Sequence, residues 1–399
     1  MKKRFEFNLQ YPKPLLENEL DQLISIAKSG LFSRYTGHIV DELEEELASY
    51  YQTEYAVTCT SGTAALHGCL VALDFSAGSE IITTSVADIG IVIPIMYENL
   101  VPVFADIDSE TYNITAEKVE KLITSKTRAV IAVHLAGNPC DLDSLVDLCK
   151  KYKIVLIEDF SQAHGAKWNK RKVGSFGQIS YGSFQQSKQI TCGEGGVIVT
   201  NDKELHRRAF IGVDKAWQRH LPLEKRFYEF LAPNVRFNAL QAAVLGPQLK
   251  RLDNLIERKR NIAEKLRQSI AYLSEYVKPQ KIYPNAFHSY YSFPLFVTDN
   301  DFRNKLVDLL EDKYNMYCAR GYANPVPLYQ CVNPLIDPGK YGKGFVYSSQ
   351  RYPEGTCPNA EELLKRSFLI PFNENYTDEE VLDISNRLSS AISECIDSI

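Results

Sequence analysis

Short apolar runs rich in β-branched residues alternate with amphipathic segments through the first half of the chain, and this alternation limits the possible folds more than any other feature. The strand-like runs include YAVTCT at 55–60, EIITTS at 80–85 and IVLIEDF at 154–160. The segments between them carry apolar residues at helical spacing, as in LDSLVDLCKKYK at 142–153. Strands that are apolar on both faces need helices on both faces. The pattern therefore predicts an α/β fold with a mostly parallel sheet between helices.

The 399 residues are more than one ordinary domain needs. From about Phe237 a long helical pattern begins, and Gly246-Pro247 is expected to kink it. We predict a large domain over 1–250 and a small C-terminal α+β domain over 251–399, reached through that long bridging helix.

Three segments of the C-terminal part carry specific expectations. HSYYSFPLFV at 288–297 is interpreted as a strand, and a final helix is expected to begin at Thr377, with Glu380 completing its N-terminal cap. The segment of about 319–360 is rich in Pro, Gly, Tyr and Asn and has little periodicity, which is typical of a functional loop.

Composition argues against several classes of partner. Lys and Arg number 45 against 50 Asp and Glu, without long blocks of one sign, so a nucleic-acid partner is not expected. The nine cysteines are odd in number and never spaced as Cys-x-x-Cys, which argues against a disulfide framework and a zinc site, and no metal is expected. No apolar stretch approaches the roughly 18 residues that a membrane span needs. We expect a cytoplasmic protein that does not enter a membrane.

Three polar features follow predicted strands, where open α/β sheets bind their ligands. Thr60-Ser61-Gly62-Thr63 is a small turn before a helix, suited to a phosphate. Asp159 ends the IVLIED strand, and Lys188 precedes the glycine-rich GEGG. Each has an ordinary explanation by itself: a capped turn, a paired carboxylate, a solvated lysine.

Together these features are the parts that hold pyridoxal 5'-phosphate. A lysine forms a Schiff base with the aldehyde, a carboxylate keeps the pyridine nitrogen protonated, and a turn with hydroxyl groups binds the phosphate. The 29 residues from Asp159 to Lys188 are enough to leave one strand and arrive on a neighbouring one.

The chain also resembles the DegT/DnrJ/EryC1/StrS family of fold-type I pyridoxal-phosphate enzymes, which are mostly sugar and cyclitol aminotransferases. The resemblance covers nearly the whole chain, and the lysine segment with its GEGG is its most specific part. The matching segments are TSGTAAL at 60–66, VPVFADIDSETYNI at 101–114, HLAGNPCDLD at 134–143, EDFSQAHGA at 158–166, SFQQSKQITCGEGGVIVTND at 183–202, NVRFNALQAAVLGPQL at 234–249 and PNAEELLKRSFLIPF at 358–372.

The resemblance implies a large domain with a mostly parallel seven-stranded sheet, plus a smaller C-terminal α+β domain. It implies that Lys188 bonds the cofactor and moves the proton between cofactor and substrate, and that Asp159 meets the pyridine nitrogen. Gln162, three residues past Asp159, matches the position that meets the 3-hydroxyl or the ring face.

The same resemblance implies the phosphate ligands. Gly62, Thr63 and Ser183 match positions that bind the phosphate in this family. Asn234 and Arg236 fall in the motif by which a neighbouring subunit completes the phosphate site, which implies a homodimer with shared active sites.

Other polar residues have less certain places. Where many family members carry an aromatic residue over the ring, this sequence has Asp88, so substrate binding by Asp88 or ring cover by Ile89 are the alternatives. His134 and His164 follow strands but lack a paired Ser or Cys, and structural roles are expected for both. Four loop residues that suit a sugar are left without a role: Tyr35, Arg320, Tyr322 and Tyr329.

The resulting hypothesis is an aminotransferase that moves an amino group from glutamate or glutamine to a keto sugar, nucleotide-linked or not, or to a keto cyclitol. Gln185-Gln186 faintly resembles cyclitol aminotransferases but does not identify the acceptor. Two alternatives remain, a sugar dehydratase using the same cofactor and a cofactor-binding regulator without turnover. The retained Lys188 favours amino transfer, because dehydratase relatives carry His there. A dinucleotide-dependent oxidoreductase would need a glycine fingerprint that is missing.

Overall fold

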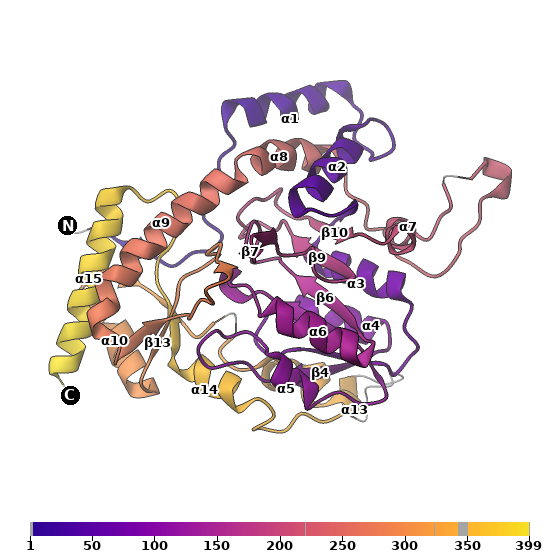
Figure 1. The fold of residues 1–399 in the computed structure, drawn as a ribbon. Helices are drawn as coiled ribbons and strands as arrows, with labels where there is room; N and C mark the ends of the chain where they lie inside the picture. Colours follow the sequence, from indigo (N-terminus) through magenta and orange to yellow (C-terminus); the bar gives the residue numbers. More distant parts are fainter. Residues whose placement is uncertain (1–2, 220, 323, 342–349, 399) are drawn as a thin grey trace.

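The computed structural model describes residues 3–219, 221–322, 324–341 and 350–398. Among them is a seven-stranded sheet in the order β2-β10-β9-β6-β5-β3-β4 (Figure 1). Its strands are β2 (Tyr55–Cys59), β3 (Glu80–Thr84), β4 (Val101–Ala105), β5 (Thr127–Val133), β6 (Val155–Asp159), β9 (Ile179–Ser183) and β10 (Gly196–Thr200). Only β10 pairs antiparallel with its neighbours, so the predicted α/β class and mostly parallel seven-stranded sheet are confirmed.

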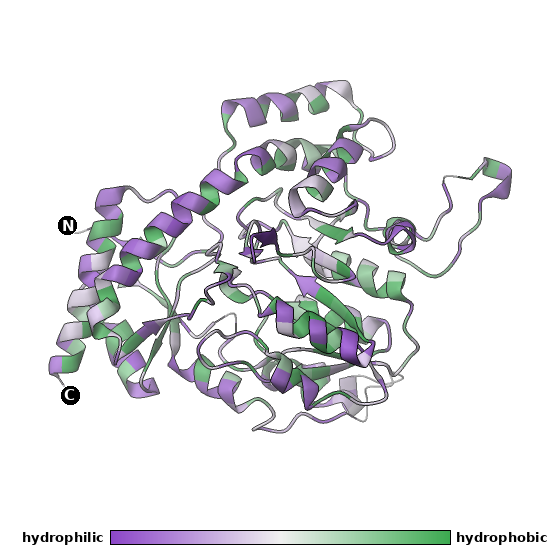
Figure 2. Ribbon diagram, in the orientation of Figure 1, coloured by the Kyte–Doolittle hydropathy of each residue, from purple (hydrophilic) through white to green (hydrophobic). Residues whose placement is uncertain are grey.

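Both faces of this sheet are covered, as the apolar strand runs require. Successive residues of β6 enter different cores: Leu156 packs with the core around α2 (Ile39–Tyr51), and Ile157 with the core around α3 (Gly62–Leu73). Figure 2 shows hydrophilic and hydrophobic residues alternating along α6 (Leu142–Tyr152), as expected of a helix with one face on a sheet.

The C-terminal part contains a second sheet in the order β11-β13-β16-β15. Its strands are β11 (Val277–Pro279), β13 (Pro294–Val297), β16 (Ser367–Leu369) and β15 (Ala319–Arg320). Helices α9 (Leu252–Ile270), α10 (Asn300–Asp312) and α15 (Asp378–Asp397) lie beside it (Figure 1). Helix α15 begins after Thr377, whose side chain and that of Glu380 form the reciprocal cap predicted.

The remaining elements are short or lie at the margins. They are β1 (Phe5–Glu6), α1 (Glu17–Ser29), η1 (Ile89–Ile91), α4 (Ile93–Tyr97), α5 (Ala116–Glu120), η2 (Leu135–Gly137), β7 (Lys167–Trp168), β8 (Arg171–Lys172), α7 (Lys203–Gly212), η3 (Leu223–Lys225), α8 (Ala239–Lys250), η4 (Ala271–Leu273), β12 (Ala286–Phe287), β14 (Met316–Tyr317), α11 (Leu328–Cys331), α12 (Asn333–Ile336), α13 (Pro338–Tyr341) and α14 (Pro358–Arg366). In the part of the chain that the structure describes, no helix has both the length and the apolar content to cross a bilayer.

Two expectations about local structure are wrong. The long helix breaks at Arg251, between α8 and α9, and Pro247 lies inside α8. Arg251 leaves helical geometry while its side chain bonds the buried Glu19 on α1. The strand expected over 288–297 is confined to Pro294–Val297. The first half of the expected strand instead forms a turn, in which Tyr290 has φ 51°.

The domain boundary at 250/251 stays a prediction. Leu328 and Tyr329, from the segment 319–360, pack into the same core as Ile157 of the large sheet. Residues 323 and 342–349 of that segment lie outside the described residues.

Candidate active site

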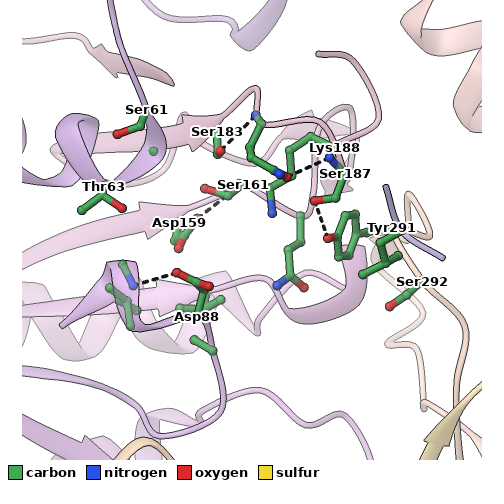
Figure 3. A pocket seen from close by; sticks show the side chains of 18 of the residues that line it. Ser61, Thr63, Asp88, Asp159, Ser161, Ser183, Ser187, Lys188, Tyr291 and Ser292 are labelled. Carbon is green, nitrogen blue, oxygen red and sulfur yellow. Dashed lines mark hydrogen bonds between the residues drawn. The ribbon is translucent and has the colours of Figure 1, made fainter. Parts of the chain in front are cut away.

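A cavity of about 570 Å³ opens at the carboxyl ends of the parallel strands. Asp159 ends β6 and Ser183 ends β9, while the turn after β2 leads into α3 beside them. Six of the predicted site residues line this single cavity: Gly62, Thr63, Asp159, Gln162, Ser183 and Lys188. Figure 3 labels Thr63, Asp159, Ser183 and Lys188 among them. The structure thus brings together the phosphate turn, the carboxylate and the lysine.

The start of α3 is suited to binding an anion. Ser61 caps the helix by accepting a 3.0 Å hydrogen bond from the Ala64 N–H. The first turn leaves backbone N–H groups without partners inside the helix, and they carry partial positive charge. A Cβ built on Gly62 would lie only 2.7 Å from Cβ of Ser183, so this position has room for glycine only.

Asp159 is nearly buried and is held by two donors. Its Oδ1 accepts a 2.8 Å bond from the Ser161 N–H, and its Oδ2 accepts a 2.8 Å bond from the Tyr181 hydroxyl. Burial, together with the adjacent Asp159 charge, raises the pKa of Tyr181 well above its ordinary value. Tyr181 therefore stays protonated and remains a donor to the carboxylate.

Gln162 connects the large sheet to the C-terminal part of the chain. Its Oε1 accepts bonds from the Ala136 N–H at 2.8 Å and from the Tyr322 hydroxyl at 2.5 Å. Tyr322, left without a role by the sequence, thus lies on the cavity wall.

Lys188 lies on a tight loop after β9. Its N–H donates to the Gln185 carbonyl at 2.9 Å, and its Nζ lies 4.7 Å from the centre of the Tyr291 ring. The Tyr291 hydroxyl in turn donates to Ser187 Oγ at 2.9 Å (Figure 3). Tyr291 reaches the cavity because its N–H bonds the Ala136 carbonyl at 2.8 Å, instead of continuing the expected strand.

Asp88 lies on the cavity wall at the position where an aromatic residue was expected. Its Oδ1 accepts a 2.8 Å bond from the Gly90 N–H, and the residue is exposed. Ile89, the other residue considered for ring cover, is not among the described residues that line the cavity, whereas Ile91 is. The lining leaves substrate binding by Asp88 open as a prediction.

The two histidines are packed behind the site. His134 bonds the buried Glu158 at 3.2 Å, and His164 bonds the Ser183 carbonyl at 2.7 Å and the Tyr51 hydroxyl at 2.6 Å. Burial lowers the pKa of His164 to about 3. Both are fully buried and neither is among the described lining residues, which fits the structural roles expected.

Asn234 and Arg236 are not among the described residues that line this cavity. They lie beside Asp214, at the base of a segment that extends from the body next to α7 (Figure 1). Arg236 forms an ion pair with Asp214, and the Tyr35 hydroxyl donates to the same carboxylate at 2.6 Å. Their predicted role in a neighbouring subunit stays a prediction.

The other two unassigned loop residues are not among the described residues that line the cavity. Arg320 pairs with Asp308 and Glu311, and the Tyr329 hydroxyl donates to Glu361 at 2.6 Å.

Sequence reasoning missed Tyr181, Tyr291 and Ser292 as lining residues. Tyr181 could have been predicted from the pattern, because it lies two residues before Ser183 on the same strand and so on the same face. Tyr291 and Ser292 were hidden by the strand expected there.

The residues fit pyridoxal phosphate. The start of α3 at Gly62 faces the Ser183 hydroxyl, and the cavity places Asp159 and Lys188 on its walls. This cofactor needs N–H groups that bind its phosphate, a carboxylate for its ring nitrogen and an amine for its aldehyde.

Comparisons with known proteins agree with this chemistry. A family model described as the DegT/DnrJ/EryC1/StrS aminotransferase family matches residues 14–389. GDP-perosamine synthase from Escherichia coli O157:H7 is 32% identical over 363 residues, which cover 90% of this chain and 91% of that protein. A putative L-glutamine:3-amino-2,3-dideoxy-scyllo-inosose aminotransferase from Micromonospora echinospora is 37% identical over 229 residues, which cover 57% of this chain and 54% of that protein.

Solved structures show the same fold. The aminotransferase from Psychrobacter cryohalolentis matches with a TM-score of 0.86 and 28% identity, covering 98% of this chain and 99% of that one. The PLP-form of a putative sugar aminotransferase from Streptococcus pneumoniae matches with a TM-score of 0.83 and 22% identity, covering 96% of this chain and 98% of that one.

Proposed function

This chain belongs to the DegT/DnrJ/EryC1/StrS aminotransferase family, and from that membership we propose that it moves an amino group from glutamate or glutamine to the keto carbon of a sugar or cyclitol, with pyridoxal phosphate in the cavity. The observation that carries the proposal is that Lys188 and Asp159 line one cavity with the N-terminus of α3. A lysine and a carboxylate in separate clefts would not serve this chemistry.

When bound, the cofactor supplies an aldehyde that bonds amines and a pyridine ring that accepts the electron pair of a broken C–H bond. Lys188 would hold the aldehyde, and its amine would carry a proton to and from the substrate carbon. Asp159, fixed by Ser161 and Tyr181, would keep the pyridine nitrogen protonated. The N–H groups at Gly62 and Thr63 and the Ser183 hydroxyl would bind the phosphate, while Gln162 would face the ring.

A sugar or cyclitol acceptor is supported by the names of the relatives, one a GDP-perosamine synthase and another an aminotransferase of an inosose. The cavity itself offers polar groups suited to hydroxyl groups. They are Gln10, Asp88, Gln185, Ser292, Tyr322 and Asn324.

We also propose a homodimer with shared active sites, in the cytoplasm. The segment 221–231 extends from the body (Figure 1) and carries four exposed apolar side chains: Leu223, Phe227, Tyr228 and Leu231. Such side chains on a projecting arm are expected to be covered by a partner. In this proposal, Asn234 and Arg236, which lie beside Asp214, would contribute to the partner's phosphate site.

The test begins with the covalent bond. Wild type and Lys188→Ala protein are loaded with pyridoxal phosphate, reduced with borohydride and weighed by intact mass spectrometry. Wild type should retain the cofactor covalently and Lys188→Ala should not. Covalent retention by Lys188→Ala would refute the assignment of Lys188.

The second step distinguishes the reaction. Glutamate and glutamine are added to the holoenzyme, and conversion of pyridoxal phosphate to pyridoxamine phosphate is followed by absorbance. Keto sugars, free and nucleotide-linked, and keto cyclitols are then screened for the reverse conversion. No conversion with any donor would indicate a regulator, and release of water from the sugar without amino transfer would indicate a dehydratase.

A further inference from the structure

The loop that carries Lys188 is fastened from outside by the N-terminal segment 9–13. Leu9 and Gln10 line the cavity, the Tyr11 carbonyl accepts a 3.3 Å bond from the Gln186 side chain, and Lys13 Nζ donates to the backbone carbonyl of Lys188 itself. The segment therefore bonds both ends of the Gln186–Lys188 turn, through Tyr11 at one end and Lys13 at the other.

The sequence around Lys13 stiffens this fastening. Pro12 and Pro14 flank it, each fixing its own φ and restricting the residue before it to extended backbone. Little backbone freedom is left to lose when Lys13 reaches the loop.

Tyr11, in the middle of the segment, is held by a largely buried charge cluster formed by α9 and the loop between β16 and α15. The Tyr11 hydroxyl donates to Glu374, and Lys259 on α9 lies 3.3 Å from the same carboxylate. Lys259 is 3% exposed, so Glu374 is its compensating charge in a poorly hydrated place. Although burial opposes it, the charge of Lys259 and the Tyr11 hydroxyl hold the pKa of Glu374 below its ordinary value.

We propose that Lys13 is a positioning residue for Lys188: its ammonium group holds the carbonyl of the catalytic lysine and so fixes the point from which that side chain enters the cavity. This inference rests on the proposed role of Lys188 as the cofactor-binding lysine. Lys13 acts through Lys188, and it is not among the described residues that line the cavity.

The surroundings of Lys13 give the contact a pH dependence. Burial, together with the charges of Lys259 on α9, Lys188 on its loop and Arg251 before α9, lowers the pKa of Lys13 to about 8, against the opposing effect of Glu374. Lys13 is charged below that pH and neutral above it. Because a charged donor makes the stronger hydrogen bond, the fastening weakens as pH rises through about 8.

The experiment compares Lys13→Met, Lys13→Gln and Lys13→Arg with wild type, and uses Lys3→Met, ten residues before Lys13, as a control. Lys3 pairs with Glu380 at the surface, with 56% of its side chain exposed, and is not among the described residues that line the cavity. The rate of the half-reaction with excess glutamate or glutamine is measured by absorbance between pH 6 and 10. Thermal unfolding of each variant monitors folding.

At pH 7 the Lys13→Met rate should fall about tenfold, the effect of losing one hydrogen bond to a charged group. The rate of Lys13→Gln should lie between those of Lys13→Met and wild type. The rate of Lys13→Arg should stay within about threefold of wild type, because arginine keeps the charge. In wild type the rate should decline above pH 8. That decline should be absent in Lys13→Met and shifted upward in Lys13→Arg. Lys3→Met should match wild type.

A second readout does not depend on turnover. In a Lys188→Ala background there is no amine to position, so Lys13→Met should leave the dissociation constant of pyridoxamine phosphate within about twofold, measured by calorimetry. A large change there would mean that Lys13 shapes the cofactor site itself and would overturn the positioning role.

Equal rates and equal pH profiles in wild type and Lys13→Gln would also overturn the inference, even if Lys13→Met failed to fold. Failure of the proposed function looks different. Wild type itself would then show no covalent cofactor after borohydride reduction, whatever residue stands at position 13.

Discussion

The carboxylate of Asp159 depends on its two donors for its orientation. The Ser161 N–H is part of the backbone that follows β6, whereas the Tyr181 hydroxyl comes from the neighbouring β9. A carboxylate in a nearly buried place needs such donors, since without them its oxygens would be left without hydrogen-bond partners away from water. Tyr181 therefore contributes to the chemistry proposed for Asp159.

Replacing Tyr181 by Phe is expected to lower the half-reaction rate about tenfold while folding is retained, because it removes one hydrogen bond to a charged group. Tyr329→Phe is the matched control, since Tyr329 is also a buried phenol that donates to a carboxylate, Glu361, but is not among the described residues that line the cavity. Stopped-flow absorbance with a fixed donor measures both rates. Equal losses in the two variants would contradict a specific role for Tyr181.

His164 predicts how stability depends on pH. Its folded pKa, about 3, is below the ordinary 6.5, so between these values the unfolded chain binds a proton that the folded chain does not. The free energy of unfolding should therefore fall as pH drops from about 6.5 toward 3, by a few kcal/mol at most. Urea titrations of wild type and His164→Gln at several pH values would measure this, and parallel curves for the two proteins would contradict it.

At this scale the sequence predicts the residues whose chemistry is rare at their positions. Asp159 at the end of an apolar strand and Lys188 before GEGG were identified in this way, and both line the cavity. Tyr291 was not identified, because its place depends on a backbone bond to Ala136, which is far away in the sequence. Local pattern carries no information on such a contact.

Among the elements, α3 is the one whose position determines what the site can bind. It begins so close to the end of β9 that a Cβ added to Gly62 would lie 2.7 Å from Cβ of Ser183. The N-terminus of the helix and the strand's last hydroxyl thus face one small volume.

Gly62→Ala is expected to weaken cofactor binding at least tenfold and to cost about 1–3 kcal/mol of stability, because the new Cβ would overlap with Ser183. Gly37→Ala is the control, since a Cβ at Gly37 would meet nothing within 4 Å. Fluorescence titration with pyridoxamine phosphate measures affinity, and urea unfolding measures stability. Wild-type affinity in Gly62→Ala would argue against a phosphate at this turn.

Element types were predictable where a residue pattern repeats, and element ends where a capping pair marks them. The parallel strands and the Thr377 cap are of this kind. The break at Arg251 was not predictable, since Pro247 is the stronger local signal and Arg251 leaves the helix while paired with Glu19, 232 residues away.

Across the whole molecule, the two ends of the chain cooperate in ways that no local pattern records. Strand β1 pairs with β14, and Phe5 enters the core formed by α9, α10 and α15. The same N-terminal segment continues past the cavity to Lys13. The N-terminal segment therefore packs both with the C-terminal helices and along the wall of the candidate active site. For this reason a single domain boundary at 250/251 remains a proposal.

The arm over 221–231 extends away from this body, and its exposed apolar residues lead to the last prediction. Leu231 is 97% exposed, so in a monomer Leu231→Glu would change little, since surface substitutions usually stay within about 0.5 kcal/mol. In a dimer that covers the arm, the same change would place an unpaired charge in an apolar contact, which is costly. Sedimentation velocity should thus show wild type as a dimer and Leu231→Glu shifted toward monomer, with a matching loss of cofactor affinity if Asn234 and Arg236 serve the partner. Leu382→Glu, at a position 61% exposed on α15, should remain dimeric. A monomeric wild type with full activity would contradict the shared site, because each cavity would then be complete within one chain.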